Sequence, residues 1–118
     1  MNLMSRKYRV FYYILPNKAN PIKDFLESLS NREKAKIFRL FQAFELYGLV
    51  AIEPHTKKLA GTPLWEIRIL GKDNIRIIYV APQKEYILAL HGFIKKTQKT
   101  PQRDINTALQ RYNEWITR

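Results

Sequence analysis

Histidine, arginine and lysine are the residue types in this sequence that could do chemistry on an anionic substrate. His55 and His91 are its two histidines, and histidine is the side chain whose unperturbed pKa lies near neutral pH. The cations stand in short groups beside apolar runs, and the densest group, "KKTQKTP" (95–101), follows the run "YILALHGFI" (86–94). Such a group serves either solubility or the binding of a polyanion, and the distribution of the other charges bears on this choice.

Composition excludes several other kinds of catalytic site. The chain has no cysteine, so it can form neither a disulfide nor a zinc–cysteine site, and a cytoplasmic location is expected. Two histidines without an H-E-x-x-H motif or an aspartate cluster are a weak metal signal, and the four glycines form no phosphate-binding loop. We therefore expect no metal and no cofactor. No apolar stretch is long enough to cross a membrane, so no membrane partner is expected.

Net charge is the strongest compositional feature. The 118 residues include 21 Lys and Arg against 10 Asp and Glu, which gives a net charge of +11. A folded domain with this excess commonly binds a polyanion, and we favour nucleic acid over a generally basic surface. The length fits a single domain, residues 1–118, and no repeat, linker or low-complexity segment divides it.

The apolar pattern predicts an α+β domain in the order β-α-α-β-β-β-α, with two N-terminal helices and a C-terminal helix packed on a small antiparallel sheet with a mixed edge. Strands are expected at 8–15, 64–70, 74–80 and 85–94, the last of them buried on both faces. Residues 50–63 are expected to form a connection.

Capping signals predict where the helices begin and end. Asn20 with Pro21 begins the first helix, Ser30 with Glu33 begins a second helix that ends at Gly48, and Thr100 is expected to cap a third with Pro101 at its first position. Aromatic residues recur at helical spacing in the second helix, which favours core packing over a platform for stacking bases. They are Phe38, Phe41 and Phe44.

The hairpin between the second and third predicted strands gives a specific expectation. If "GKD" (71–73) is a three-residue turn, Arg68 lies opposite Arg76 on one face of the sheet. Two like charges in that position need either carboxylate partners or an anion between them, and guanidinium groups bind phosphate well. We favour an anion site, and the alternative is that Glu66 and another acid neutralise the arginines.

Cleavage of RNA is a reaction that this set of residues could support. The 2′-OH is an internal nucleophile beside the phosphate, so a protein needs only to orient it, stabilise the developing charge and assist proton transfer. His55 is a candidate general base or acid. His91 lies in the middle of a predicted strand, where a structural histidine with satisfied hydrogen bonds is the better interpretation.

Three segments carry a resemblance to a known family. "LWEIR", "RIIY" and "HGFIKKTQKTP", in this order, closely resemble the HigB-like branch, partly phage-derived, of the RelE/ParE toxin superfamily, and the resemblance covers most of the chain. It implies a RelE-like microbial RNase fold and a toxin of a type II toxin–antitoxin module. It further implies a metal-independent endoribonuclease that cleaves mRNA, often on the ribosome, and causes growth arrest. A HigA-like helix-turn-helix antitoxin is the implied protein partner.

The resemblance also suggests roles for particular residues. It implies catalytic roles for Arg68, Arg76, Lys95, Lys96 and, by its place in the loop before the hairpin, His55. RNA binding is implied for Lys57, Lys58 and Lys99, and expected of Arg6 and Lys7 from their charge. Some relatives have an acid and a histidine where this chain has Lys95 and Lys96, so the general base and acid are left open.

Other functions remain open at this stage. A ParE-like member of the same superfamily would act on DNA gyrase, and the "KKTQKTP" segment favours the HigB-like branch over it. A basic domain of this size could also bind nucleic acid without cutting it, with an affinity that falls steeply with salt. A decayed prophage relic would retain only antitoxin binding.

Overall fold

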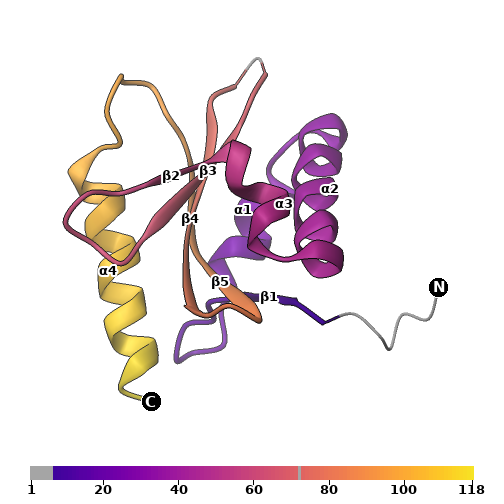
Figure 1. Cartoon of the computed structure of the whole chain (residues 1–118). Coiled ribbons are helices and arrows are strands. Elements are labelled where there is room, and N and C mark those ends of the chain that lie inside the picture. Colours follow the sequence, from indigo (N-terminus) through magenta and orange to yellow (C-terminus); the bar gives the residue numbers. More distant parts are fainter. Residues whose placement is uncertain (1–6, 72) are drawn as a thin grey trace.

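The computed structural model describes residues 7–71 and 73–118 (Figure 1). Its strands are β1 (Arg9–Tyr12), β2 (Thr56–Lys58), β3 (Trp65–Ile69), β4 (Ile75–Gln83) and β5 (Tyr86–Ile94). Its helices are α1 (Pro21–Glu27), α2 (Asn31–Tyr47), α3 (Leu49–Ile52), the 3-10 helix η2 (Glu53–His55) and α4 (Gln102–Ile116). The predicted α+β class is confirmed.

A single five-stranded sheet forms the centre of the molecule, in the order β1-β5-β4-β3-β2. Neighbouring strands are antiparallel except at one edge, where β1 runs parallel to β5. The order differs from the prediction because the expected connection at 50–63 contains α3, η2 and the short strand β2. β2 has no alternating apolar pattern of its own, and its strand conformation depends on pairing with Trp65–Ile67 of β3.

The helix starts follow local capping chemistry at two of the three predicted sites. The Asn20 side chain accepts a hydrogen bond from the Lys23 amide, and Ser30 and Glu33 form a reciprocal capping box. The prediction for the last helix was wrong by one position. Pro101 is the N-cap and α4 begins at Gln102, because the Thr100 hydroxyl donates a hydrogen bond to Glu66 instead of capping the helix.

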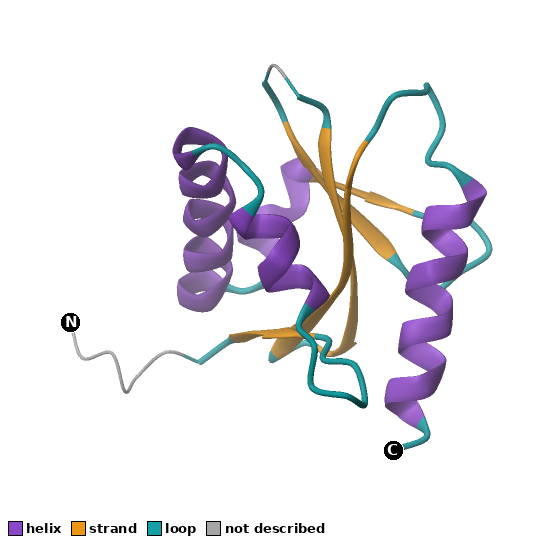
Figure 2. Ribbon diagram, turned by 180° about the vertical axis from the view of Figure 1, so that it is seen from behind, coloured by secondary structure: helices purple, strands orange, loops and turns teal. Residues whose placement is uncertain are grey.

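Two apolar cores lie on opposite faces of the sheet. Figure 2 shows α1, α2 and α3 on one side of the strands and α4 on the other. β5 contributes to both cores, with Ile87 and Ala89 facing the α1–α2 side and Leu88 and Leu90 facing the α4 side. Burial of β5 on both faces is therefore confirmed.

The predicted apolar face of α2 is only partly buried. Phe41 and Phe44 belong to the core, but Phe38 is 47% exposed, so the expectation of core packing was wrong for this residue. Phe38 lies beside the buried side of α2. It is at the rim of the sheet, where α2 faces the edge strand β1 and not the central strands.

Candidate functional site

The predicted pairing of the two hairpin arginines is confirmed. Arg68 of β3 lies opposite Arg76 of β4, and Arg76 lies opposite Phe93 of β5. The neighbouring row on the same face contains Lys57, Glu66, Ile78 and His91. Because Ile78 packs in the core under α4, both rows lie on the face of the sheet that α4 covers.

A carboxylate neutralises Arg76. Its Nε lies 2.9 Å from Oε1 of Glu66, and the two residues are 9% and 1% exposed. These two atoms make no well-aligned hydrogen bond, so the contact is chiefly electrostatic. The Arg76 guanidinium also donates to the Ile75 carbonyl at 3.1 Å, while the other oxygen of Glu66 accepts from the Thr100 hydroxyl. For Arg76, the structure therefore shows the alternative, an acidic partner, and not the favoured anion site.

Arg68 has a different environment from the arginine opposite it. It is exposed and stands one residue beyond the part of β3 that pairs with β2. Among residues 7–71 and 73–118, no carboxylate lies within ion-pair distance of its guanidinium. Arg68 therefore has an exposed positive charge that an external anion can reach.

At the edge of the sheet, beyond the end of β2, Arg68 borders an open hollow on the α2 side together with three other basic residues, although strand alternation places its Cβ on the α4 face. We call this the basic hollow and define it by Lys36, Arg39, His55 and Arg68, with the apolar wall Leu40, Ile69 and Leu70. Lys36 is held in place because its Nζ donates to the Leu70 carbonyl at 3.0 Å. Sequence reasoning missed Lys36 and Arg39. Their spacing puts them on one side of α2, but only the packing of α2 beside β3 turns that side toward His55 and Arg68.

The two lysines of β2 lie on opposite faces of the sheet. Lys57 pairs with Glu66 and so shares the face of Arg68, whereas Lys58 pairs with Trp65 and has its Nζ 5.7 Å from the centroid of that indole ring. Both side chains are exposed. The structure therefore brings Lys57, but not Lys58, onto the arginine face.

We call residues 95–101, which follow β5, the basic loop. This loop lies at the same end of the sheet as the β3–β4 turn (Figures 1 and 2). The Lys95 amide donates to the Asn74 carbonyl at 2.7 Å, which ties the start of the loop to this turn. Lys96 and Lys99 are exposed and Lys95 is half-buried. The Thr100 hydroxyl fastens the other end of the loop to Glu66.

Lys7, the first described cation of the chain, does not join this group. Lys7 is exposed and precedes β1, which pairs with Tyr86–Ala89, the half of β5 that is remote from the basic loop. Arg6 lies outside the described residues. An RNA contact through Lys7 would therefore be separate from one through the basic hollow.

His91 has the environment of a structural histidine. Its Nε2 lies 2.7 Å from Oδ1 of Asp104 in α4, and its ring stacks on Phe93 with the centroids 5.5 Å apart. Burial lowers the pKa of His91 below its usual value, and the Arg111 guanidinium acts in the same direction, although the Asp104 carboxylate opposes both. A neutral ring that donates from Nε2 fits these contacts.

The described residues contain neither a cluster of metal ligands nor a membrane-spanning helix. Across residues 7–71 and 73–118 there is no group of three or more His, Cys, Asp or Glu side chains arranged to hold a metal ion. None of the helices in that part of the chain is both long and apolar enough to cross a membrane.

Comparison with known proteins gives a family for the chain. Residues 24–113 match the family model described as phage-derived protein Gp49-like, and these residues include α2, the basic hollow and the basic loop. No curated protein matches the sequence. Members of the matched family are toxins of toxin–antitoxin systems and are generally endoribonucleases that cleave mRNA. Because the match spans well over half of its length, the chain belongs to the phage-derived Gp49-like family, a RelE/HigB-type toxin family, and an antitoxin is its implied partner.

Proposed function

We propose that this protein is an mRNA endoribonuclease of the HigB-like branch, with a RelE-like fold, that cleaves RNA without a metal. In this reaction the 2′-oxygen attacks the adjacent phosphorus, the bond from phosphorus to the 5′-oxygen breaks, and a 2′,3′-cyclic phosphate forms. One group takes the proton of the 2′-OH and another gives a proton to the leaving oxygen. Messages on the ribosome are the proposed substrate, translation is inhibited as a result, and a HigA-like helix-turn-helix protein is the proposed antitoxin.

The observation that carries this proposal is the basic hollow. Three cations and a histidine from α2, η2 and β3 surround one open space there, beside the unpaired charge of Arg68. Preorganised cations around a phosphate stabilise the charge that develops in the transition state, and this effect is commonly the largest single contribution to catalysis. His55 is exposed at the rim, so it can reach a 2′-OH or a leaving oxygen of a bound RNA.

The basic residues have different roles in this proposal. Arg68 binds the scissile phosphate, and Lys57, Lys95, Lys96 and Lys99 hold flanking phosphates at the same end of the sheet. Arg76 acts indirectly, because its charge is balanced by Glu66 and its side chain is almost buried. Its contribution is to hold the strand pair and the basic loop in position beside Arg68.

The test is RNA cleavage by the Arg68→Ala variant, with Lys84→Ala as the matched control. Both are exposed cations, but Lys84 lies in the β4–β5 turn at the other end of the sheet. Primer extension on total mRNA after induced expression should show discrete cuts for the wild type and for Lys84→Ala. We expect Arg68→Ala to cut about 100-fold more slowly, the usual effect of losing one group that stabilises an oxyanion.

Other outcomes separate the competing functions. Growth arrest without cuts, together with loss of supercoiling by purified gyrase, would replace this proposal with ParE-like inhibition. RNA binding that weakens steeply with salt, without any cut product, would indicate a binding domain that is not an enzyme. Equal cleavage by Arg68→Ala and Lys84→Ala would remove the basic hollow from the site.

A further inference from the structure

The outer edge of β1 is a strand edge whose backbone groups have no partner among residues 7–71 and 73–118. The sheet ends at β1, whose only strand neighbour among residues 7–71 and 73–118 is β5. The amides of Arg9 and Tyr13 donate toward β5, to the carbonyls of Glu85 and Ala89 at 3.0 and 2.9 Å. Because strand residues alternate in direction, the N–H and C=O groups of Val10 and Tyr12 face away from β5. An unpaired edge of this kind is a template for another strand.

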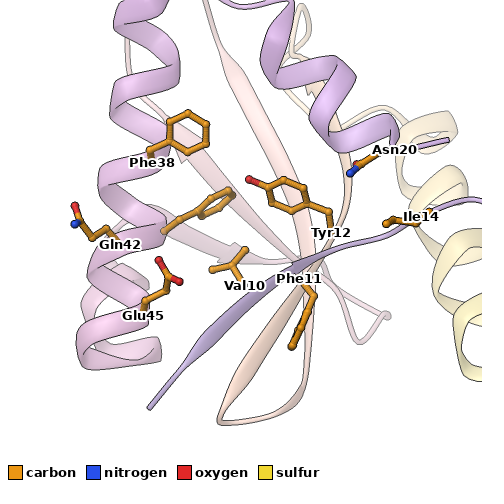
Figure 3. Close-up of a pocket in the computed structure, with 9 residues that line it drawn as sticks. Val10, Phe11, Tyr12, Ile14, Asn20, Phe38, Gln42 and Glu45 are labelled. Carbon is orange, nitrogen blue, oxygen red and sulfur yellow. The ribbon is translucent and has the colours of Figure 1, made fainter. Parts of the chain in front are cut away.

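A groove with both apolar and polar walls runs along this edge between β1 and α2. It is an open cavity of about 610 Å³, and its walls include Val10 and Tyr12 from β1 and Phe38, Gln42 and Glu45 from α2. Figure 3 shows the side chains of Val10 and Tyr12 on the side of β1 that faces α2, while Phe11 points to the opposite side.

Large apolar side chains are exposed along the groove. Phe38 is 47% exposed and Ile14, just after β1, is 40% exposed, while Phe11, on the other side of β1, is 47% exposed. Single exposed apolar residues are common on protein surfaces, but a group of them next to a free strand edge is typical of an interaction site.

We propose that the antitoxin docks here by adding an extended segment as a strand beside β1. In this mode the backbone groups of Val10 and Tyr12 pair with the added strand, and its alternate side chains fill the groove against Phe38. The proposal rests on membership of the toxin family and does not require the ribonuclease activity proposed above. β1 pairs with the first half of β5, so this anchor is remote from the basic loop that follows Ile94.

Charge favours this occupant over a second copy of the chain. Each copy has a net charge of +11, and pairing of two β1 strands would bring Lys7 and Arg9 of both copies toward the same edge. Lys or Arg at a strand edge opposes such self-pairing. An acidic segment is attracted instead, and the same net charge speeds its association. The segment should therefore place its carboxylates toward Lys7 and Arg9.

Amide hydrogen exchange tests the proposed pairing directly. The probe is the antitoxin partner, purified with the chain as a complex and compared with the free chain by NMR. We expect the amides of Val10 and Tyr12 to exchange at least tenfold more slowly in the complex, because each gains a strand partner. The amide of Tyr13, already bonded to Ala89, serves as the internal reference.

Two matched pairs of variants test the same contact by calorimetry. Val10→Pro removes the outward N–H and keeps the bonds to β5, and Val10→Ala controls for the lost side chain. Phe38→Ala removes a groove wall, and Tyr47→Ala controls for it because Tyr47 is an aromatic residue on α2, 67% exposed, that does not line the groove. We expect Val10→Pro and Phe38→Ala each to weaken antitoxin binding at least tenfold, and each control to change it less than threefold. The Phe38 pair keeps the test decisive if Val10→Pro does not fold.

Three results would overturn the proposal. Unchanged affinity of Phe38→Ala, with no new protection of Val10 and Tyr12, would place the antitoxin elsewhere. Concentration-dependent protection of these amides in the chain alone would assign the edge to a second copy. Absence of any complex would also refute it. None of these results depends on RNA cleavage, so they can be distinguished from failure of the ribonuclease proposal.

Discussion

Replacement of Glu66 by glutamine should destabilise the protein strongly, although it hardly changes the size of the side chain. The Glu66 carboxylate lies 2.9 Å from the Arg76 guanidinium, and the two residues are 1% and 9% exposed. Glutamine has nearly the same size and still offers an oxygen to the Thr100 hydroxyl. The change therefore isolates the loss of a negative charge beside a buried cation.

The expected magnitude follows from the burial of the pair. Removing one partner of a buried ion pair costs about 3–5 kcal/mol, because the other charge stays buried without compensation. We expect about 3 kcal/mol, the lower end of this range, since the guanidinium keeps its hydrogen bond to the Ile75 carbonyl at 3.1 Å. The free energy of unfolding, from urea titration followed by circular dichroism, is the quantity to measure.

A double-mutant cycle decides whether the pair itself is responsible. Glu66→Gln, Arg76→Gln and their combination should show a coupling of about 2 kcal/mol, so that the double variant is more stable than the sum of the single effects implies. Arg68→Gln is the control, since this exposed arginine lies opposite Arg76 and its loss should change stability by about 0.5 kcal/mol or less. A loss below about 1 kcal/mol for Glu66→Gln, or additive single effects, would contradict burial of this pair.

Two further changes test the packing on either side of β5. The pKa of His91 is lower in the folded protein than in the unfolded chain, so the unfolded chain binds a proton more readily. The stability that His91 contributes is therefore complete above pH 6.5 and is lost as the pH falls below that value. His91→Gln should flatten this part of the pH profile of the unfolding free energy. A weaker acid dependence in the wild type than in His91→Gln would refute the assignment. Gly92→Ala would place a Cβ 2.3 Å from a ring carbon of Phe25, so we expect a loss of about 1–3 kcal/mol in the same urea titration. An equally stable alanine variant with Phe25 unmoved would contradict this close packing.

Local chemistry made several elements predictable from the sequence. The Asn20 cap, the Ser30–Glu33 capping box and the hairpin register that pairs Ile69 with Ile75 each depend on residues a few positions apart, so the chain alone indicates them. The register that places Arg68 opposite Arg76 follows from the turn in the same way. The basic character and the absence of cysteine are properties of composition and need no fold.

Pairing between distant segments decided what the sequence could not. Strand β2 is too short and too polar to be recognised, and it exists because Thr56–Lys58 pairs with β3. Thr100 has the type and position of a helix cap, yet its hydroxyl binds Glu66, because the loop folds back over the sheet. Local propensity therefore identified Thr100 as a residue whose hydroxyl forms a hydrogen bond, but it predicted the wrong partner.

The candidate site also combines features that the sequence determined with features that only the tertiary structure decided. The sequence by itself determined that Arg68 and Arg76 share a face, since strand alternation and turn length are local properties. Only the tertiary structure decided their different environments: Glu66 and Thr100 enclose Arg76, whereas Arg68 lies beyond the end of β2, at an open edge beside Lys36, Arg39 and His55. The physical reason is that burial and charge compensation depend on which distant segments pack around a side chain, and no spacing within one strand specifies those neighbours.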